Sequence, residues 1–476
     1  MKAITILSLM TALGASVSAR APVTLNLTGH IDASQVMSFV YVPFQVEPET
    51  TSVYVLQNYS LHGQGNSLDL GVFDQRGHQL MNGVNDTFGS RGWSGGFRNN
   101  FTITPSWATP GYNPGAIEPG TWNVALGPYN SIPEGIDWQL QIVMSFDPVD
   151  TYFSPTFAQV DFDTIGQFEQ QEWLRGDFHM HTVYSDGKYT PDEQIQHALA
   201  QNLNFIFFSD HNTDSSNNII GAHQQALAPD LLICRAIEVT TRHGHWQAAG
   251  LDREQRIDWR YQDVAGFADA TKQVHRAGGF VSVNPPFAAC AACNWGFNDW
   301  DHNDAIEVWN ADFDSTDQQA VQKWHDLLVA GKYTAAIGGS DSHSPPSMNG
   351  VPTTVVSTRG RKQSAIVAAV KNARAYIVDG PGKSMSFNIN VHNTVAQIGD
   401  KVHGASAGDQ ASLTVEGMSG QKACFISDKG YFYNTTITDH HALRHQLPAG
   451  LKFVRVEVRN VTDDSALGLT NPIWFL

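Results

Sequence analysis

The chain has 476 residues and carries 29 Lys and Arg against 46 Asp and Glu, which gives a formal net charge of −17. At roughly 100–200 residues per domain this length predicts about three domains. The hydrophobic share of 42% and charged share of 16% exclude a disordered chain. The acidic balance argues against nucleic acid or an anionic membrane as the main partner. Of the 19 His, 11 lie from His179 to His343, and this cluster is the strongest indication of a functional site in the composition.

Residues 1–19 predict a secretory signal peptide. Lys2 is followed by a short apolar run, and Val17-Ser18-Ala19 fits a small-residue cleavage site. No other stretch approaches the roughly 18 apolar residues that span a bilayer, so we expect a secreted, soluble protein without a membrane partner. Six Asn-x-Ser/Thr sequons avoid the stretch from Gln170 to Gly380 and predict glycosylated flanks, at Asn26, Asn58, Asn85, Asn100, Asn434 and Asn460.

Four cysteines are too few to build a disulfide scaffold of this size. Cys290 and Cys293 form a CxxC that could be a tight disulfide, a redox pair or half a zinc site. Without a second CxxC we favour a local disulfide in an oxidising compartment. Cys234 lies in an apolar run and is expected to be a small core residue.

Residues 20–165 read as an N-terminal β-sandwich, because short alternating runs are separated by Gly, Pro and Asn. The expected strands include Val23–Leu27, Thr51–Gln57, Leu68–Phe73, Thr121–Leu126 and Trp138–Ser145.

Residues 170–380 read as a βα array with parallel strands, in which chemistry gathers where the strands end. The expected helices are Pro191–Gln201, Val264–Ala277, Gln318–Ala330 and Gln363–Ala373. The expected strands are Phe205–Phe208, Leu231–Ile237, Phe280–Val283, Ala305–Trp309 and Ala335–Ile337. Residues 381–476 return to strands alone and predict a small C-terminal β domain.

The expected strands of the central array end in metal-ligand residues. His179 and His181 are two positions apart, so in extended chain both rings point the same way and can hold one ion. The other strand-end residues of this kind are Asp186, Asp210, His211, Glu238, His245, Asp341 and His343. Each signal is weak alone, but a cleft lined by so many imidazoles and carboxylates is costly unless a cation neutralises it. The set therefore predicts a metal site.

The chain carries, in this order, HxH with SDG, SDHN, a strand-end Glu before GH, and GSDSH. This order of motifs resembles that of the PHP (polymerase and histidinol phosphatase) metallohydrolases. Further residues look like their carbaryl-hydrolase-like (CehA/McbA) branch: Ile306-Glu307-Val308-Trp309-Asn310, Gly380-Pro381 and Thr470-Asn471-Pro472-Ile473. The motifs span His179 to His343, and the looser likeness runs to the C-terminus. The resemblance implies a distorted (βα)7 barrel with two or three divalent ions.

Carried over residue by residue, the resemblance implies one ion on His179, His181, Glu238 and Asp341. It implies a second on Asp186, His211 and His343, with Zn, Mn or Fe left open. Members with a third ion use a His like His245 and the His of a His-Pro motif. Here Pro285 stands at that position after Asn284, so two ions are preferred. His243 could substitute for that ligand, but a solvent-facing residue of the turn is the favoured interpretation.

The expected chemistry is hydrolysis by a water that the ions activate. Asp210 is a candidate proton relay or helix cap, and Arg242 a candidate anion-binding or surface residue. Trp246, Phe287, Trp295 and Trp309 are candidates for an apolar pocket or for the core. Few basic residues, Lys188, Arg235 and Arg242, accompany the motifs, which favours a carboxylic or carbamate ester over a small phosphomonoester or phosphodiester. An inactive secreted binding protein is the remaining alternative.

Overall fold

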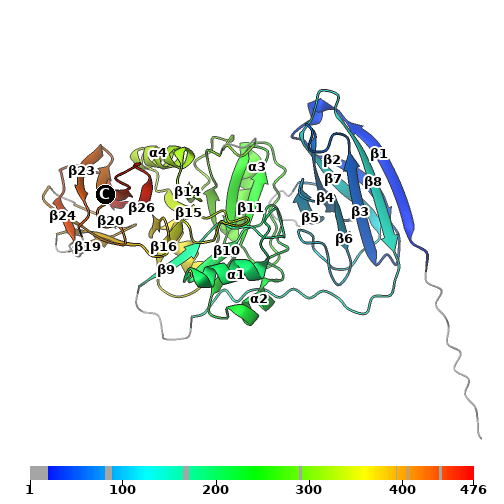
Figure 1. Cartoon of the computed structure of the whole chain (residues 1–476), viewed down its shortest axis with the longest axis horizontal. Coiled ribbons are helices and arrows are strands. Elements are labelled where there is room, and N and C mark those ends of the chain that lie inside the picture. Colours follow the sequence, from blue (N-terminus) through cyan, green and yellow to red (C-terminus); the bar gives the residue numbers. More distant parts are fainter. Residues whose placement is uncertain are drawn as a thin grey trace, which may run out of the picture.

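The computed structural model describes residues 20–80, 88–163, 171–288, 292–392, 394–404, 407–438 and 442–476. The proposed signal peptide, Asn85 and Cys290 lie outside these ranges. Three blocks follow one another along the long axis: a β-sandwich, a mixed α/β block, and a C-terminal β block (Figure 1). None of the described helices is long and apolar enough to cross a membrane.

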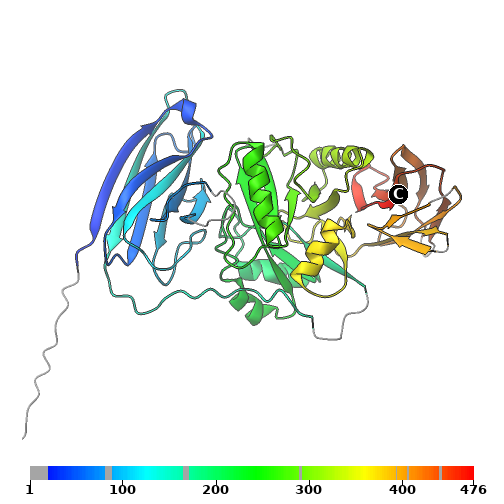
Figure 2. The ribbon, with the colours of Figure 1, turned by 180° about the vertical axis from the view of Figure 1, so that it is seen from behind.

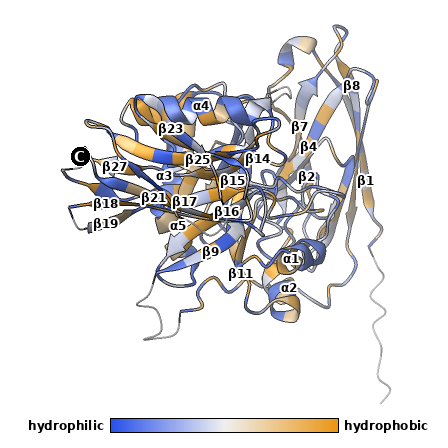
Figure 3. Cartoon of the chain, turned by 60° about the vertical axis from the view of Figure 1, so that its left-hand side comes forward, coloured by the Kyte–Doolittle hydropathy of each residue, from blue (hydrophilic) through white to orange (hydrophobic). Residues whose placement is uncertain are grey.

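The N-terminal block consists of two four-stranded sheets that enclose one hydrophobic core. One sheet has the order β1 (Val23–Ile31), β8 (Ile136–Ser145), β3 (Ser52–Tyr59), β6 (Asn100–Ile103). The other has the order β2 (Val40–Val46), β7 (Gly120–Asn130), β4 (Ser67–Phe73), β5 (Ser90–Gly95). Hydrophobic and hydrophilic residues alternate along β1, as expected where one face of a strand packs on a core (Figure 3).

The central sheet runs through nine strands before it enters the C-terminal block. Their order is β15 (Ala335–Gly339), β14 (Ala305–Asn310), β13 (Phe280–Val283), β12 (Gly244–Ala249), β11 (Leu232–Thr241), β10 (Phe205–Phe208), β9 (Glu172–Asp177), β16 (Thr353–Thr358), β17 (Ala375–Val378). β15 ends this path, and the segment after it returns to the segment after β9. His181 N donates to Ser342 O at 3.0 Å, and Asp341 N donates to His179 O at 2.9 Å. Both loops therefore meet at one place.

The mixed α/β class is confirmed, but the strands are not all parallel. β12 pairs antiparallel with both β11 and β13, and β16 is antiparallel to β9 and β17. Only Arg242 and His243 connect β11 to β12, and parallel neighbours need a crossover of a dozen or more residues. This pairing does not establish a regular (βα)7 barrel. β11 also continues past Ile237, so Glu238 lies within the strand.

The helices lie outside the curved sheet: α1 and α2 are in front in Figure 1, and α3 and α5 face the viewer in Figure 2. They are α1 (Pro191–Ala200), α2 (Ile220–Leu227), α3 (Val264–Arg276), α4 (Ser315–Val329) and α5 (Gln363–Lys371), with a 3-10 turn, Ala33–Gln35, in the sandwich. Thr190 and Glu193 form a capping box at the start of α1, and Asp314 caps α4. These caps satisfy backbone N–H groups that have no partner inside the helix.

The C-terminal block is not a detached domain, because β17 pairs with β26. The central sheet continues through β26 (Ala466–Thr470), β25 (Phe453–Arg459), β22 (Lys422–Ser427) and β23 (Gly430–Thr436), with β27 (Ile473–Phe475) and β20 (Lys401–Val402) beside them. A second sheet of β19 (Thr394–Gln397), β18 (Ser384–Val391), β21 (Gln410–Glu416) and β24 (Leu443–Gln446) packs on it over a shared core.

Cys293 is disulfide-bonded, whereas Cys234 and Cys424 are free and buried. Burial raises the pKa of the Cys234 thiol, as expected for an inert core cysteine.

Candidate metal centre

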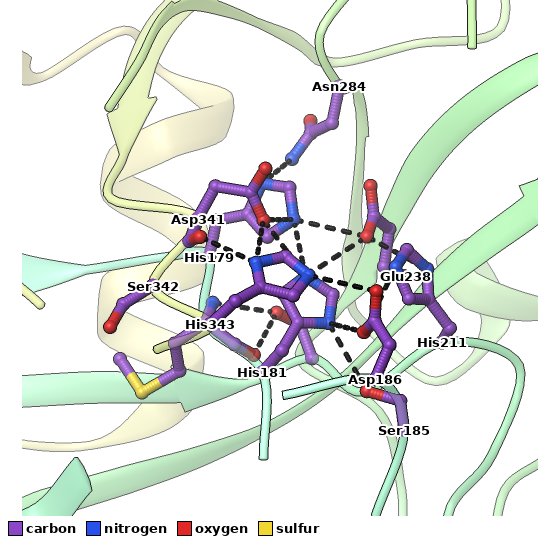
Figure 4. A network of polar contacts seen from close by, with 12 residues as sticks. His179, His181, Ser185, Asp186, His211, Glu238, Asn284, Asp341, Ser342 and His343 are labelled. Atoms are coloured by element: carbon purple, nitrogen blue, oxygen red, sulfur yellow. Dashed lines mark hydrogen bonds and ion pairs between the residues drawn. The ribbon is translucent and has the colours of Figure 1, made fainter. Parts of the chain in front are cut away.

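His179 and His181 follow β9 and point into the same place, with Nε2 atoms 3.0 Å apart (Figure 4). Met180 between them points the other way and packs in the core beside α1 and α2. This is the alternation of extended chain. Two ring nitrogens that face each other at this distance need a proton or a shared cation between them.

Glu238 and Asp341 complete the first group of donors. The Oε2 atom of Glu238 lies 3.1 Å from His179 Nε2 and 3.2 Å from His181 Nε2. Asp341 Oδ1 lies 3.2 and 3.1 Å from the same two nitrogens. A Cβ on Gly339 would come within 2.4 Å of His179 Cβ, so glycine lets β15 bring Asp341 this close.

Asp186, His211 and His343 form a second group beside the first. Asp186 Oδ2 lies 3.2 Å from His343 Nε2, and its Oδ1 lies 3.6 Å from His211 Nε2. His181 joins the groups, because its ring stacks on those of His343 and His211 with centroids 4.0 and 4.4 Å apart. The ligand atoms of His181, Asp186, His211 and His343 all lie within 4.8 Å of one another. All seven residues assigned to the two ions are thus brought together.

The electrostatics of these groups fit a bound cation. Burial opposes charge on His179, yet Asp341 and Glu238 hold the pKa of its imidazole well above the usual value. Conversely, burial alone would raise the pKa of Glu238, but His179 and His211 hold it well below its usual range. Burial lowers the pKa of His211 to about 4, which leaves this ring neutral with a free lone pair. Imidazole and carboxylate donors of this kind suit Zn, Mn or Fe.

Two buried oxygens give an independent test of the fit. Asp186 Oδ1 and Asp341 Oδ1 are buried and accept no hydrogen bond. A buried carboxylate oxygen without a donor is costly unless a cation faces it. Each atom belongs to one of the two donor groups, so the residues present fit two divalent ions. The number and identity of the ions remain a prediction.

Glu307 supports the centre from behind, and its role was not predicted. It lies in the middle of β14, fully buried, and accepts from His179 Nδ1 at 3.0 Å. Asn284 Nδ2 and Asn310 Nδ2 donate to its two oxygens at 2.9 and 2.6 Å. A carboxylate on Nδ1 fixes the tautomer of a ligand histidine and leaves Nε2 free for the ion. The signal was a lone Glu inside an otherwise apolar strand.

Asp210 lies behind the site and does not line the cavity. It is fully buried and accepts from Thr182 N at 2.8 Å and from Ser185 Oγ at 2.7 Å. These contacts hold the turn that carries Asp186. Asp177 acts similarly: its Oδ1 accepts from the N–H groups of His179 and Ser340.

His245 lies on β12 with Nδ1 3.3 Å from Glu238 Oε1, and His211, Glu238 and His245 form a further group of possible ligands. Pro285 lines the cavity at the position where the sequence lacks a His. Asn284 donates to Glu307, while its Oδ1 has no hydrogen-bond donor. His243 belongs to no such group among the described residues and packs against Phe297.

A cavity of about 810 Å³ opens above the donors. Arg242 lines it, but its Nη2 is paired with Asp69 Oδ2 of the sandwich at 3.0 Å. Trp246, Trp295 and Trp309 are core residues with exposures of 0, 5 and 1% and do not line the cavity, and Phe287 packs beside the core near β14. The aromatic residues that line it are Phe39, Trp93, Phe97, Tyr129 and Trp259.

No family model and no curated protein matches the chain. Among solved structures, one similar chain is a two-domain protein from Bacteroides vulgatus that contains a predicted PHP-like metal-dependent phosphoesterase. It is 18% identical to this protein over 66% of this chain and all of its own, with a TM-score of 0.38. An amidohydrolase from Chromobacterium violaceum with bound sulfate and no metal is 17% identical over 36% of this chain and 88% of its own, with a TM-score of 0.26.

A protein from Bifidobacterium adolescentis, named as a metal-dependent phosphoesterase, is 16% identical over 37% of this chain and 90% of its own, with a TM-score of 0.28. At these TM-scores the likenesses decide neither fold nor activity. The carbaryl-hydrolase-like branch finds no support among them.

Proposed function

We propose that this protein is a metal-dependent hydrolase that cleaves an uncharged ester bond, either a carboxylic or a carbamate ester. The observation that carries the proposal is the pair of donor groups, joined at His181, on the floor of a substrate-sized cavity. Divalent ions bound there would lower the pKa of a water molecule and polarise the carbonyl oxygen of the substrate.

The protein's own residues hold and orient this centre. Glu307 keeps a proton on Nδ1 of His179 and so directs Nε2 towards the other donors. Thr240 Oγ1 lies 2.5 Å from Nδ1 of His211 and orients that ring. The burial of Glu238 and of both HxH rings excludes water from the floor, which strengthens the electrostatic interactions there.

The charge on the cavity wall favours an uncharged ester over a phosphoester. Six carboxylates line it, Asp69, Asp186, Glu238, Asp312, Asp314 and Asp341, and Arg242 is the one Lys or Arg among its described residues. Arg242 is already neutralised by Asp69. Arg235 donates to the Leu251 carbonyl away from the cavity, and Lys188 is absent from its lining. A phosphate would therefore meet the ions without further cationic clamps.

We also propose that the protein is secreted and glycosylated. The N-terminal signal pattern and the sequons support this, because Asn26, Asn58, Asn100 and Asn434 are exposed and open to a glycan. Peptide mass mapping of the secreted protein tests it, and unmodified peptides at all sequons would contradict it.

The test of the hydrolase is turnover by purified, metal-loaded protein of carboxylic and carbamate esters beside 4-nitrophenyl phosphate and bis(4-nitrophenyl) phosphate. We expect ester turnover that chelation abolishes and added metal restores. His181→Ala should lose it, whereas His275→Ala, a half-exposed histidine paired with Asp304, is the matched control. Phosphate turnover without ester turnover would favour a phosphoesterase. Absence of stoichiometric metal would favour a binding protein.

A further inference from the structure

The N-terminal sandwich and the central block share a hydrophobic core, which fixes one against the other. Phe73, Phe88 and Trp93 of the sandwich belong to the same buried cluster as Val239, Trp246 and Trp259 of the centre. The Trp93 and Trp259 rings are 5.2 Å apart, and Phe73 stacks on Trp259 at 6.5 Å. The sandwich face that meets the centre is therefore a rigid wall.

Polar contacts reinforce this docking around the cavity. Arg98 donates to the carbonyls of Val183 and Ser185 at 2.5 and 3.0 Å, directly before the ligand Asp186. On the other side Arg260 donates to Tyr41 Oη at 2.6 Å. These contacts place the edge of the sandwich over the metal centre.

Four aromatic side chains of the sandwich face the cavity: Phe39, Trp93, Phe97 and Tyr129. Phe39 packs edge-on against Trp93 with centroids 5.9 Å apart. Phe97 is 64% exposed, although large apolar side chains favour burial. Its ring is thus available to cover an apolar group that enters the cavity.

The one guanidinium among the described residues that line the cavity comes from the central block, between β11 and β12, and it forms an ion pair with the sandwich. Arg242 is paired with Asp69, and it lies over the rings of Phe39 and Tyr129 at 5.1 and 5.2 Å. A Cβ on Gly127 would lie 2.6 Å from Arg242 Nη2, so glycine gives the arginine room to reach across. The pair offers little net charge to a substrate, and the surrounding rings suit an uncharged aromatic group.

The geometry points to a binding site for an uncharged aromatic group of the substrate on the sandwich wall formed by Phe39, Trp93, Phe97 and Tyr129. This inference rests on the proposed function, because the ester bond would lie over the metal donors on the floor of the same cavity. The sandwich is then part of the active site and sets which esters are cleaved.

Three esters test the site by pH-stat titration: ethyl butanoate, phenyl butanoate and ethyl phenylacetate. For each ester the ratio of kcat/KM in variant and wild type cancels its intrinsic reactivity. Phe97→Ala, which is safe for folding because the side chain is exposed, should lower kcat/KM about tenfold for at least one aromatic ester. It should change kcat/KM for ethyl butanoate less than about twofold. Tyr152→Ala, 72% exposed and absent from the cavity lining, is the matched control.

Equal losses on all three esters, or none, would overturn the inference while leaving the hydrolase in place. If no ester is turned over, a binding measurement still tests the aromatic site separately from the proposed hydrolase activity. Calorimetry with benzyl alcohol and the metal-loaded protein should show binding that Phe97→Ala and Tyr129→Leu both weaken about tenfold and Tyr152→Ala leaves unchanged. Absence of benzyl alcohol binding, or indifference to both cavity variants, would exclude the aromatic site.

Discussion

Glu307→Gln should weaken metal binding at the group that contains His179 without opening the fold. The substitution keeps the shape of the side chain but removes its charge. Glu307 accepts from His179, Asn284 and Asn310, and each of its oxygens already faces at least one asparagine N–H. An amide nitrogen in place of either oxygen would therefore face a donor, and His179 would lose the carboxylate that fixes its tautomer.

The size of the effect follows from that lost partner. Carboxylates behind ligand histidines are worth about 10–100-fold in metal affinity, which is about 1.4–2.7 kcal/mol. The loss should fall on the ion of His179, His181, Glu238 and Asp341. The ion of Asp186, His211 and His343 should keep its affinity to within a few fold, because none of those residues touches Glu307.

Competition with a chromogenic chelator would measure both dissociation constants. Glu457→Gln is the matched control: Glu457 is as buried as Glu307 but pairs with Arg455 and Arg459 in the C-terminal block. It should lower stability and leave both metal affinities unchanged. Wild-type affinity in Glu307→Gln, or a loss confined to the second ion, would refute the assigned role.

Three further predictions concern the donors and their support. Asp341→Ala should abolish metal-dependent turnover while circular dichroism shows the β structure retained, and remaining turnover would remove Asp341 from the ligands. Arg98→Ala should weaken the second ion about tenfold by freeing the turn before Asp186, because hydrogen bonds from a charged donor are worth about 1.5–3 kcal/mol, and the exposed Arg359→Ala should not. Burial opposes protonation of His181, but Asp341 and Glu238 raise its pKa to about 10 in the metal-free protein. Metal binding should then release protons at pH 7.5, and calorimetry in two buffers with different ionisation enthalpies detects this release. In the metal-free protein, the proton on His181 contributes its full stabilisation below pH 6.5. The free energy of unfolding should therefore fall as the pH rises towards 10.

The sequence predicts what depends on neighbouring residues. Strands Phe205–Phe208 and Phe280–Val283 have the bounds expected from their apolar runs, and the four expected helices begin or end within three residues of the observed ones. The HxH pair needs only local extended chain to point both rings one way. Helix α2 and strand β9 were not predicted, because neither stands out by periodicity from the polar segments around it.

What depends on distant partners was not predicted. The sequence of β12 mixes His245 and Gln247 with Trp246 and two alanines and does not show the direction of the strand, and only the two-residue turn before it decides that it returns antiparallel. Glu307 acts through His179, which is 128 positions away in the chain. The aromatic cavity wall belongs to the sandwich, and of the two alternatives for Trp246, Trp295 and Trp309 the structure supports the core. Those rings fill the core beneath the sheet.

The buried charges argue that the metal-donor groups do not serve only to stabilise the fold. Glu238 and Glu307 have exposures of 1 and 0%, and both contact His179 within 3.1 Å. Without an ion the fold must keep protons on buried rings, and Asp186 Oδ1 and Asp341 Oδ1 have ion-pair contacts with imidazoles in place of directed hydrogen bonds. Well-packed apolar residues would generally stabilise such a position at least as well as paired charges. A bound cation interacts with the imidazole lone pairs and the carboxylates together, so the donor groups stabilise the fold only when the ions are bound.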